Sequence, residues 1–351
     1  MLTIIRYLLF PFSLIYGFII WIRNKLFDRK ILRSASFNFP LICIGNLAAG
    51  GTGKTPMTEY LVRLLEKKFV IATLSRGYKR TTKGFLIADE NSTAADIGDE
   101  PMQMHKKFAD LTVAVHEERV LGIPQLLFEK PQTQVIILDD AFQHREVNAG
   151  MNVLLTEYDH LYTRDFMLPT GNLRDVKSSS KRANIIVVTK CKASLNEKEK
   201  NEILTELNPL DSQQVFFTTI DYANPYHIFT NEIKILEQAH KTLLISGIAN
   251  PTPLEKMLSD YNITYEMMLF KDHYAFSIKD IKEIKKRFSK LESPDKIILT
   301  TEKDATRLAK YANELKGLPV YAIPMQHKFL FGEEIKFDAE IISFVENYVP
   351  D

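Results

Sequence analysis

Residues 41–55 read Leu-Ile-Cys-Ile-Gly-Asn-Leu-Ala-Ala-Gly-Gly-Thr-Gly-Lys-Thr, an apolar run followed by a glycine-rich turn and a lysine–threonine pair. A strand, a glycine-rich turn and a helix in this order are what a phosphate-binding loop (P-loop) requires. The glycines let consecutive backbone N–H groups converge on phosphate oxygens, and the helix N-terminus adds its dipole. We therefore expect Gly50, Gly51, Thr52 and Gly53 to hold the phosphates of a nucleotide.

Lys54 and Thr55 complete this loop. Lys54 is expected to reach the β- and γ-phosphates, and the Thr55 hydroxyl to bind Mg²⁺. The usual pattern begins with glycine five residues before Gly53, where this chain has Ala48. A glycine-rich turn that binds nothing would not explain why lysine and threonine follow in the required order. The sequence predicts a protein that uses ATP or GTP.

The composition is that of an ordinary globular protein, and 351 residues suit two domains or one large α/β domain with additions. Lys plus Arg number 45 and Asp plus Glu 44, so no net field steers the chain to nucleic acid. Cys43 and Cys191 lie in or beside apolar runs, which suits reduced, buried thiols, and no Cys/His spacing typical of a zinc site occurs. Reduced cysteines and nucleotide use favour the cytoplasmic side.

The N-terminus departs from this pattern, because residues 8–22 read LLFPFSLIYGFIIWI without a charge. No small-residue cleavage site of a signal peptide follows. A membrane-spanning helix needs about 20 apolar residues, whereas this run is shorter and contains Pro11 and Gly17. An interfacial helix, whose flanking cations meet anionic lipid, is the favoured interpretation; a strained membrane span and a helix buried in the protein's own core are the two alternatives. Those cations are Arg23, Lys25, Arg29, Lys30 and Arg33.

Apolar, β-rich runs recur along the chain and alternate with segments of helical spacing, such as 57–67. Near-continuous apolar runs such as 135–138 are typical of parallel strands covered on both faces. The predicted fold is therefore α/β, a P-loop NTPase-like, doubly wound and mostly parallel sheet, whose ligands lie beyond the carboxyl ends of the strands. The expected strands are 40–45, 69–75, 111–116, 134–139, 151–156 and 184–190.

A second set of strands is expected at 214–219, 241–247, 296–301 and 319–324, with an amphipathic helix at 279–292 whose lysines face solvent. The segment 157–182 lacks a period and is expected to be a long functional loop. We divide the chain into an N-terminal membrane-associating segment (1–35), a P-loop domain (36–213) and a smaller α/β domain (214–351).

Two acidic pairs are candidates for chemistry. Asp139 and Asp140 end an apolar strand next to the expected P-loop, where a carboxylate usually anchors Mg²⁺, although a solvated turn is the alternative. Asp99 and Glu100 lie in a loop expected to open toward the same edge, and Asp99 could equally be a helix N-cap. His144 follows closely after the first acidic pair. Arg76 ends a strand and could bind phosphate or an anionic substrate.

Together, the motifs resemble the tetraacyldisaccharide 4'-kinase family, membrane-associated kinases of lipid A assembly in Gram-negative bacteria. The similarity runs from about residue 1 to about residue 310 in the family's order. The motifs are IGNLAAGGTGKTP, LSRGY, GDEP, LDDAFQH, LPTGNLRD, VVTK, SGIANP, FKDHYAF and TEKDA.

The resemblance implies transfer of the γ-phosphate of ATP to the 4'-hydroxyl of an acylated glucosamine disaccharide 1-phosphate, at the cytoplasmic face of the inner membrane. It implies that Asp99 is the general base and that His273 pairs with it. Glu100, Asp139 and Asp140 would hold or orient Mg²⁺ with His144 close by, and Arg174 would neutralise phosphate charge. The family more often has glutamate at Asp175, and Lys303 and Asp304 match a family motif without an assigned role.

Two other classes of function remain open at this stage. Val187-Val188-Thr189-Lys190 is a weak match to a guanine-reading motif, but Asn is replaced by Thr and the position of the discriminating carboxylate holds Lys192. A membrane-docked GTPase switch is therefore one alternative. A nucleotide-driven transport or assembly subunit is the other, with the apolar N-terminus as a partner contact.

Overall fold

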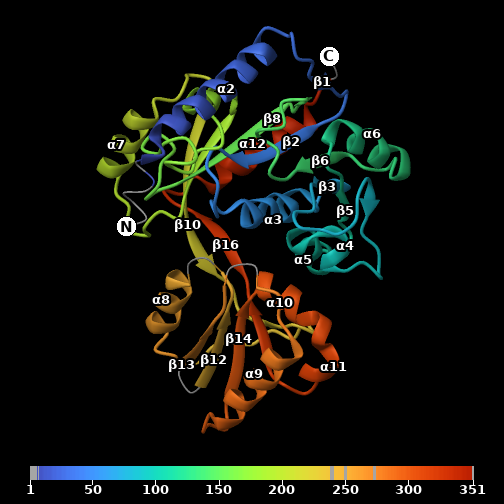
Figure 1. Cartoon of the computed structure of the whole chain (residues 1–351), viewed down its shortest axis with the longest axis vertical. Coiled ribbons are helices and arrows are strands. Elements are labelled where there is room, and N and C mark those ends of the chain that lie inside the picture. Colours follow the sequence, from blue (N-terminus) through green and yellow to red (C-terminus); the bar gives the residue numbers. More distant parts are fainter. Residues whose placement is uncertain (1–5, 7, 238–240, 249–250, 272–273, 350–351) are drawn as a thin grey trace.

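The structure is a computed structural model that describes residue 6 and residues 8–349, apart from 238–240, 249–250 and 272–273. Figure 1 shows two α/β units stacked along the long axis of the molecule and joined by strands β10 (Gln214–Tyr222) and β16 (Met325–Phe329). The larger unit contains the P-loop and the smaller unit lies below it.

The larger unit is built on a nine-stranded sheet with the order β16-β10-β9-β8-β2-β6-β3-β5-β4. Seven strands from β10 to β5 run parallel to their neighbours, and the edge strands β16 and β4 are antiparallel. The predicted parallel, doubly wound sheet is therefore confirmed. The bounds are β2 Leu41–Asn46, β3 Ile71–Ser75, β4 Leu86–Ile87, β5 Thr112–Val115, β6 Val135–Leu138, β8 Met151–Glu157 and β9 Ile185–Thr189. A separate two-stranded ladder pairs β1 (Ala35–Ser36) with β7 (Val147–Asn148).

Helices cover both faces of this sheet, which explains why its central strands are apolar along their whole length. One face is packed by α3 (Lys54–Leu65), α5 (Asp99–Lys107) and α12 (Glu334–Glu346). The other is packed by α6 (Arg119–Glu129), α7 (Glu197–Leu207) and residues of the 158–183 segment. The 158–183 segment has little regular structure besides a 3₁₀ helix, Lys177–Arg182. Elsewhere in the chain, the short helix α4 (Ala94–Ile97) precedes α5. Cys43 and Cys191 are free and buried, as expected.

The smaller unit has a five-stranded sheet with the order β11-β15-β14-β12-β13, parallel except at β11. Its helix α9 (Ile278–Lys290) buries Ile281, Ile284 and Phe288 and turns its lysines to solvent, as the spacing predicted. The other elements are β11 Tyr226–His227, β12 Lys241–Ser246, β13 Thr264–Leu269, β14 Lys296–Thr301, β15 Val320–Ile323, α8 Thr252–Asp260, α10 Glu302–Leu308 and α11 Ala312–Leu315.

The chain crosses between the two units twice. Strand β10, expected in the second set, instead pairs in parallel with β9 of the large sheet. After β15 the chain returns to that sheet as β16, and α12 packs Phe337 and Ile341 against it. The expected boundary at residue 213 would therefore separate β10 and β16 from the sheet in which they pair. We propose instead that the smaller unit comprises residues 223–324.

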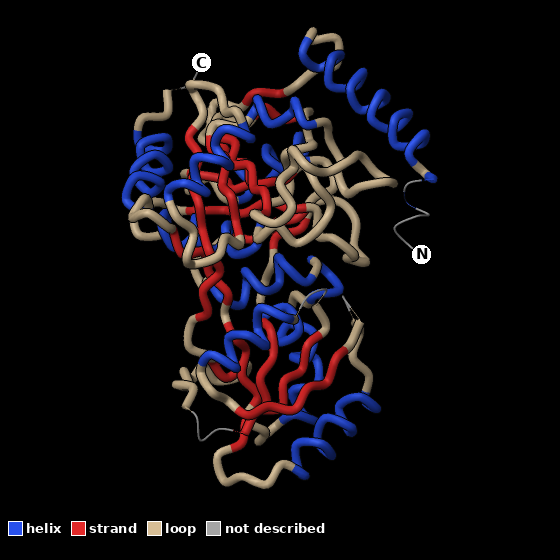
Figure 2. Tube along the Cα trace, turned by 90° about the vertical axis from the view of Figure 1, so that its left-hand side faces the viewer, coloured by secondary structure: helices blue, strands red, loops and turns tan. Residues whose placement is uncertain are grey.

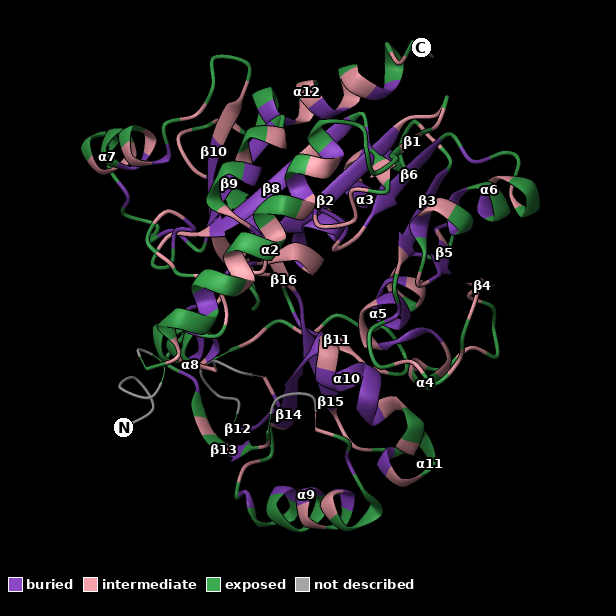
Figure 3. Cartoon of the chain, turned by 45° about the horizontal axis from the view of Figure 1, so that its top comes forward, coloured by how far each residue is buried: buried purple, intermediate pink, exposed green. Residues whose placement is uncertain are grey.

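The N-terminal helix α2 (Phe10–Asp28) lies against the larger unit and leaves most of its surface exposed (Figure 3). In the tube view the N-terminal end of α2 lies away from the sheet (Figure 2). Among the described residues, none of the helices has the length and apolar character needed to span a bilayer.

Candidate functional site

The P-loop connects β2 to α3 at the carboxyl edge of the large sheet. Gly53 caps α3 with a φ of 85°, and Gly50 has a φ of 129°, so both positions require glycine. The glycine Gly51 is exposed and Thr52 is buried beneath the loop. Lys54 and Thr55 follow in the first turn of α3, as predicted.

Lys54 contacts two further polar side chains at this edge. Its Nζ lies 3.2 Å from Asn46 Oδ1 and 3.6 Å from Asp140 Oδ1. Arg174 approaches the same two residues, with its Nη2 2.6 Å from Asn46 Oδ1 and 2.8 Å from Asp140 Oδ1. The structure therefore brings together Lys54, Asp140 and Arg174, all predicted, around Asn46, which was not. Asn46 could have been noticed as the polar last residue of an apolar strand.

The two aspartates that follow β6 have different environments. Burial opposes ionisation of Asp140, but the charges of Lys54 and Arg174 outweigh it and lower its pKa to about 2. Burial raises the pKa of Asp139 to about 6, and the nearby carboxylates of Glu100 and Asp140 add to this effect. Thr58 of α3 donates to Asp139 Oδ1 over 3.1 Å.

The carboxylate oxygens of Asp139 and Asp140 are suitable ligands for a Mg²⁺ ion that is also bound by a nucleotide. No group of three His, Cys, Asp or Glu side chains in the described part of the chain could hold a metal ion alone. Mg²⁺ is usually bound by one or two carboxylates together with substrate phosphates, so this arrangement is the expected one. Burial is the main cause of the raised pKa of Asp139, and a divalent cation would relieve the carboxylate repulsion that adds to it.

Asp99 and Glu100 begin α5 on the side that faces the smaller unit. The N-cap of α5 is Gly98, and no side chain caps the helix, so the N-cap alternative for Asp99 is wrong. Instead, Asp99 Oδ2 accepts hydrogen bonds from Arg307 Nε and Nη2, over 2.9 and 2.7 Å. Glu100 Oε1 lies 3.5 Å from Lys303 Nζ. Both cations come from α10, and Arg307 was missed by sequence reasoning.

Arg307 is also bound by a second carboxylate, that of Asp304. Its Nη1 donates to Asp304 Oδ1 over 3.0 Å, and Asp304 is fully buried. Asp304 Oδ2 accepts from the Gly247 N–H and from the Thr301 hydroxyl, over 2.9 and 2.8 Å. Asp304 in the TEKDA motif thus has a structural role in the smaller unit. His273, predicted to pair with Asp99, lies outside the described residues.

The remaining predicted residues, Arg76 and His144, lie at the same edge. Arg76 is exposed just after β3. Burial lowers the pKa of His144 to about 4, and the charges of Arg119 and Arg76 lower it further, so His144 is neutral near pH 7. Arg119 is buried and donates to the backbone carbonyl of Asp139 over 3.1 Å. It fixes the backbone of the acidic pair and was not predicted.

Another unpredicted residue, His327 of β16, supports the P-loop. Its Nε2 lies 2.9 Å from the Gly53 carbonyl oxygen and its Nδ1 2.9 Å from Thr218 Oγ1. Burial lowers its pKa to about 4, so the imidazole is neutral. Since the carbonyl can only accept, Nε2 carries the proton and Nδ1 accepts from the threonine hydroxyl.

Comparison with known proteins agrees with this geometry. A family model described as "Tetraacyldisaccharide-1-P 4'-kinase" matches residues 5–346. A tetraacyldisaccharide 4'-kinase of Flavobacterium johnsoniae is 46% identical over 99% of this chain and 100% of its own length. One from Bacteroides thetaiotaomicron is 45% identical over 96% and 92%. The crystal structure of LpxK from Aquifex aeolicus in complex with ATP superposes with a TM-score of 0.77, at 29% identity, covering 97% of this chain and 99% of the other.

Proposed function

This chain belongs to the tetraacyldisaccharide 4'-kinase family, and from that premise we propose that it transfers the γ-phosphate of ATP to the 4'-hydroxyl of a tetraacyldisaccharide 1-phosphate. The product is the bis-phosphorylated precursor of lipid A. The observation that carries this proposal is the convergence of Lys54, Asp140 and Arg174 beside a glycine-rich loop at a helix N-terminus. ATP and Mg²⁺ are the cofactors.

The proposed roles follow from what phosphoryl transfer requires. The 4'-oxygen forms a bond to the γ-phosphorus while the bond to the β–γ bridging oxygen breaks, so the protein mainly positions groups and neutralises charge. Lys54 and Arg174 are the cations placed to face the phosphates. Thr55, Asp139 and Asp140 would hold Mg²⁺, with Glu100 nearby, and the ion would supply further neutralisation.

Asp99 is proposed as the group that takes the proton of the sugar hydroxyl. Its carboxylate is held by Arg307 from the smaller unit, where α10 packs against α5. The neighbouring positions Glu100 and Lys303 form an ion pair at the same contact. A base fixed in this way needs no rearrangement as the hydroxyl proton becomes acidic during transfer. We also propose that Arg76 and His144 lie along the path of the anionic substrate.

The membrane surface is the proposed partner, with the chain peripheral or monotopic on the cytoplasmic face of the inner membrane. The support is the outer face of α2, which exposes Phe12, Leu14, Ile15, Phe18, Ile19 and Trp21. An exposed apolar patch of this kind is typical of helices that lie in a lipid interface. A substrate anchored in the bilayer by acyl chains must be met there.

The reaction is tested by incubating the protein with labelled Mg-ATP and detergent-dispersed tetraacyldisaccharide 1-phosphate, with Lys54→Ala in parallel. We expect labelled lipid from the wild type, and a kcat for Lys54→Ala lower by roughly 10²–10³ because a cation that faces the transferred phosphate is lost. Near-normal activity of Lys54→Ala would contradict the P-loop assignment. Hydrolysis of nucleotide without labelled lipid would favour the switch or assembly alternatives.

A further inference from the structure

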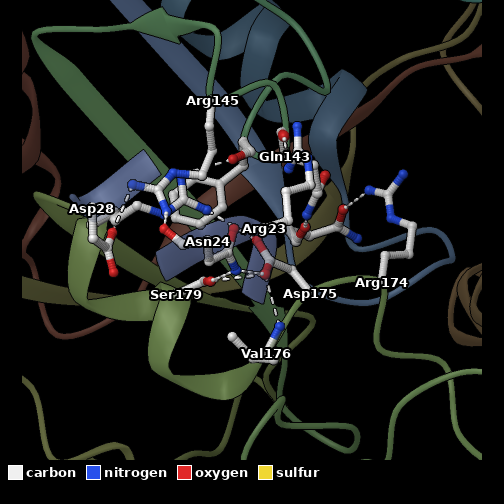
Figure 4. A network of polar contacts seen from close by, with 12 residues as sticks. Arg23, Asn24, Asp28, Gln143, Arg145, Arg174, Asp175, Val176 and Ser179 are labelled. Carbon is white, nitrogen blue, oxygen red and sulfur yellow. Dashed lines mark hydrogen bonds and ion pairs between the residues drawn. The ribbon is translucent and has the colours of Figure 1, made fainter. Parts of the chain in front are cut away.

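Helix α2 has the reverse of the usual polarity. Its buried residues include Ser13 and Asn24, while Phe18 and Ile19 are 60% and 56% exposed. A helix that packs only to hide apolar surface turns its apolar stripe inward. The side of α2 that faces the protein therefore makes specific polar contacts, and Figure 4 shows where they lead.

Asn24 binds a buried carboxylate in the loop that carries Arg174. Its Nδ2 donates to Asp175 Oδ1 over 2.7 Å and to Ser179 Oγ over 3.1 Å. Asp175 is only 2% exposed. It also accepts from Ser179 Oγ, from the Val176 N–H and from Arg182 Nη2, over 2.8, 2.8 and 3.0 Å. A buried carboxylate is stable only with such partners, so Asn24 helps to fix the residue directly after Arg174.

Tyr16 binds the backbone of Arg174 itself. The Tyr16 hydroxyl donates to the Arg174 carbonyl oxygen over 3.2 Å. Burial raises the pKa of Tyr16, and the charge of Asp175 adds to this, so the hydroxyl keeps its proton. The side chain of Arg174 meanwhile reaches Asp140 and Asn46. Helix α2 thus holds the main chain of Arg174 at its carbonyl and, through Asp175, at the next residue.

We propose that Tyr16 and Asn24 are positioning residues for Arg174, so that the helix with the exposed apolar face also sets the arginine that neutralises phosphate charge. The inference rests on the proposed function through the role of Arg174 alone. Precise placement matters because a displacement of about 1 Å at a reacting centre can cost roughly 10²-fold in rate. Removing α2 contacts would then slow the reaction even where membrane binding is not limiting.

The test is a double-mutant cycle between Asn24→Leu and Arg174→Ala, with detergent-dispersed lipid at saturation. Asn24→Leu keeps the side-chain volume and removes the donor to Asp175. We expect kcat to fall about tenfold, less than the roughly 10²-fold cost of a displacement of about 1 Å at a reacting centre, while the KM for lipid stays constant. The double variant should have the kcat of Arg174→Ala alone, because Asn24 acts through Arg174. Losses that multiply would overturn the proposal, as would a folded Asn24→Leu with wild-type kcat.

Asp28→Asn is the matched control. It removes another polar contact of α2, the 2.8 Å ion pair with Arg145, while Arg145 Nη1 still donates to the Asn24 carbonyl and Asn24 keeps its hydrogen bond to Asp175. We expect its kcat to equal that of the wild type, and an equal loss in both variants would show general loosening of α2 and overturn the proposal. If Asn24→Leu does not fold, Tyr16→Phe takes its place in the cycle, with an expected loss of about threefold.

A readout without lipid separates this proposal from the proposed function. The same cycle is run on the dissociation constant of a non-hydrolysable Mg-ATP analogue. We expect weaker binding by Asn24→Leu and, again, no further weakening when Arg174→Ala is already present. If lipid is never phosphorylated but this pattern holds, the function fails and the positioning inference stands. If lipid is phosphorylated and both cycles are additive, the inference alone fails.

Discussion

His327 shows how a single buried side chain can set the geometry of the P-loop. It is neutral and donates through Nε2 to the carbonyl of Gly53, the residue that caps α3. A Cβ on Gly53 would lie 3.0 Å from the imidazole, so the two residues are in close contact. The hydrogen bond orients the peptide group after Gly53, and with it the first backbone N–H groups of α3.

We predict that His327→Leu weakens Mg-ATP binding by roughly 3- to 10-fold, the value of one hydrogen bond to the Gly53 carbonyl. His327→Gln should recover most of the affinity, because its amide nitrogen can replace Nε2 as donor. Titration calorimetry with a non-hydrolysable analogue measures both. Equal affinities in the two variants and the wild type would show that the imidazole only fills space.

Some site residues belong to local sequence motifs, whereas others are brought to the site by contacts between distant parts of the chain. Lys54 and Asp140 could be predicted because each belongs to a local motif that follows a strand, and Arg174 because it lies in a motif, GNLRD, that resembles the family's. Arg307 is 208 positions from Asp99, and His327 is 274 positions from Gly53. Neither belongs to a recognisable pattern, since a lone arginine on a helix or a lone histidine on a strand is usually structural. The packing of α10 against α5 places Arg307, and the return of the chain to the large sheet as β16 places His327.

At the scale of elements, α2 has two faces with separate tasks. Its inner face makes the contacts to Asp175 and Arg174, and its outer face exposes large apolar side chains. A deletion of the whole segment would disturb both faces at once. Substitutions on the outer face alone are therefore the sharper test of membrane docking.

We predict that replacing Phe18 and Ile19 by serine lowers binding to anionic phospholipid vesicles by about tenfold for each side chain, since each large apolar group contributes about 1.5 kcal/mol or more when fully inserted. Affinity for Mg-ATP should not change. Vesicle sedimentation measures the partition coefficient. Unchanged sedimentation of the double variant would contradict an interfacial role for this face.

Most elements could be predicted from their sequence, and two that matter could not. Buried parallel strands such as β6 and β9 read as unbroken apolar runs, which is why their positions were clear. Strand β16 reads Met-Gln-His-Lys-Phe, with polar residues that bind at the P-loop or face solvent. A short antiparallel edge strand of this kind carries little periodic signal, and α12 after it was not assigned either. Strand β16 joins the large sheet by pairing with β10, and α12 packs on that sheet, so both depend on contacts with distant parts of the chain.

At the scale of the whole molecule, the two units meet through α10. Lys107 of α5 forms ion pairs with both Glu59 of the P-loop helix and Glu302 of α10. Tyr226 donates to Glu302 Oε1 over 3.1 Å. Burial raises the pKa of Glu302 to about 7, and the charge of Glu59 adds to this against the opposing charge of Lys107. Two buried carboxylates thus share the Lys107 ammonium between the units, and Glu59 forms a further ion pair with Arg63.

The raised pKa gives the contact a predictable pH dependence. Between the ordinary value of 4.5 and about 7 the folded state binds more protons than the unfolded state, so stability falls as pH rises through this window. Glu302→Gln resembles the protonated form. We predict that its melting temperature exceeds that of the wild type by a few degrees at pH 8, and that the difference shrinks as pH falls through the window and vanishes below pH 4.5. Parallel melting curves across this range would contradict the account, and Glu66→Gln, at an exposed position, is the control.

The central claim is that the P-loop and Asp99 act together on a lipid hydroxyl. The measurement that tests it most directly is transfer of labelled γ-phosphate from Mg-ATP to tetraacyldisaccharide 1-phosphate in detergent micelles, with Asp99→Asn beside the wild type. We predict labelled lipid from the wild type, and a kcat for Asp99→Asn lower by roughly 10²–10⁴ with unchanged Mg-ATP affinity. A wild type that hydrolyses ATP without labelling lipid, or an Asp99→Asn variant with normal kcat, would contradict it.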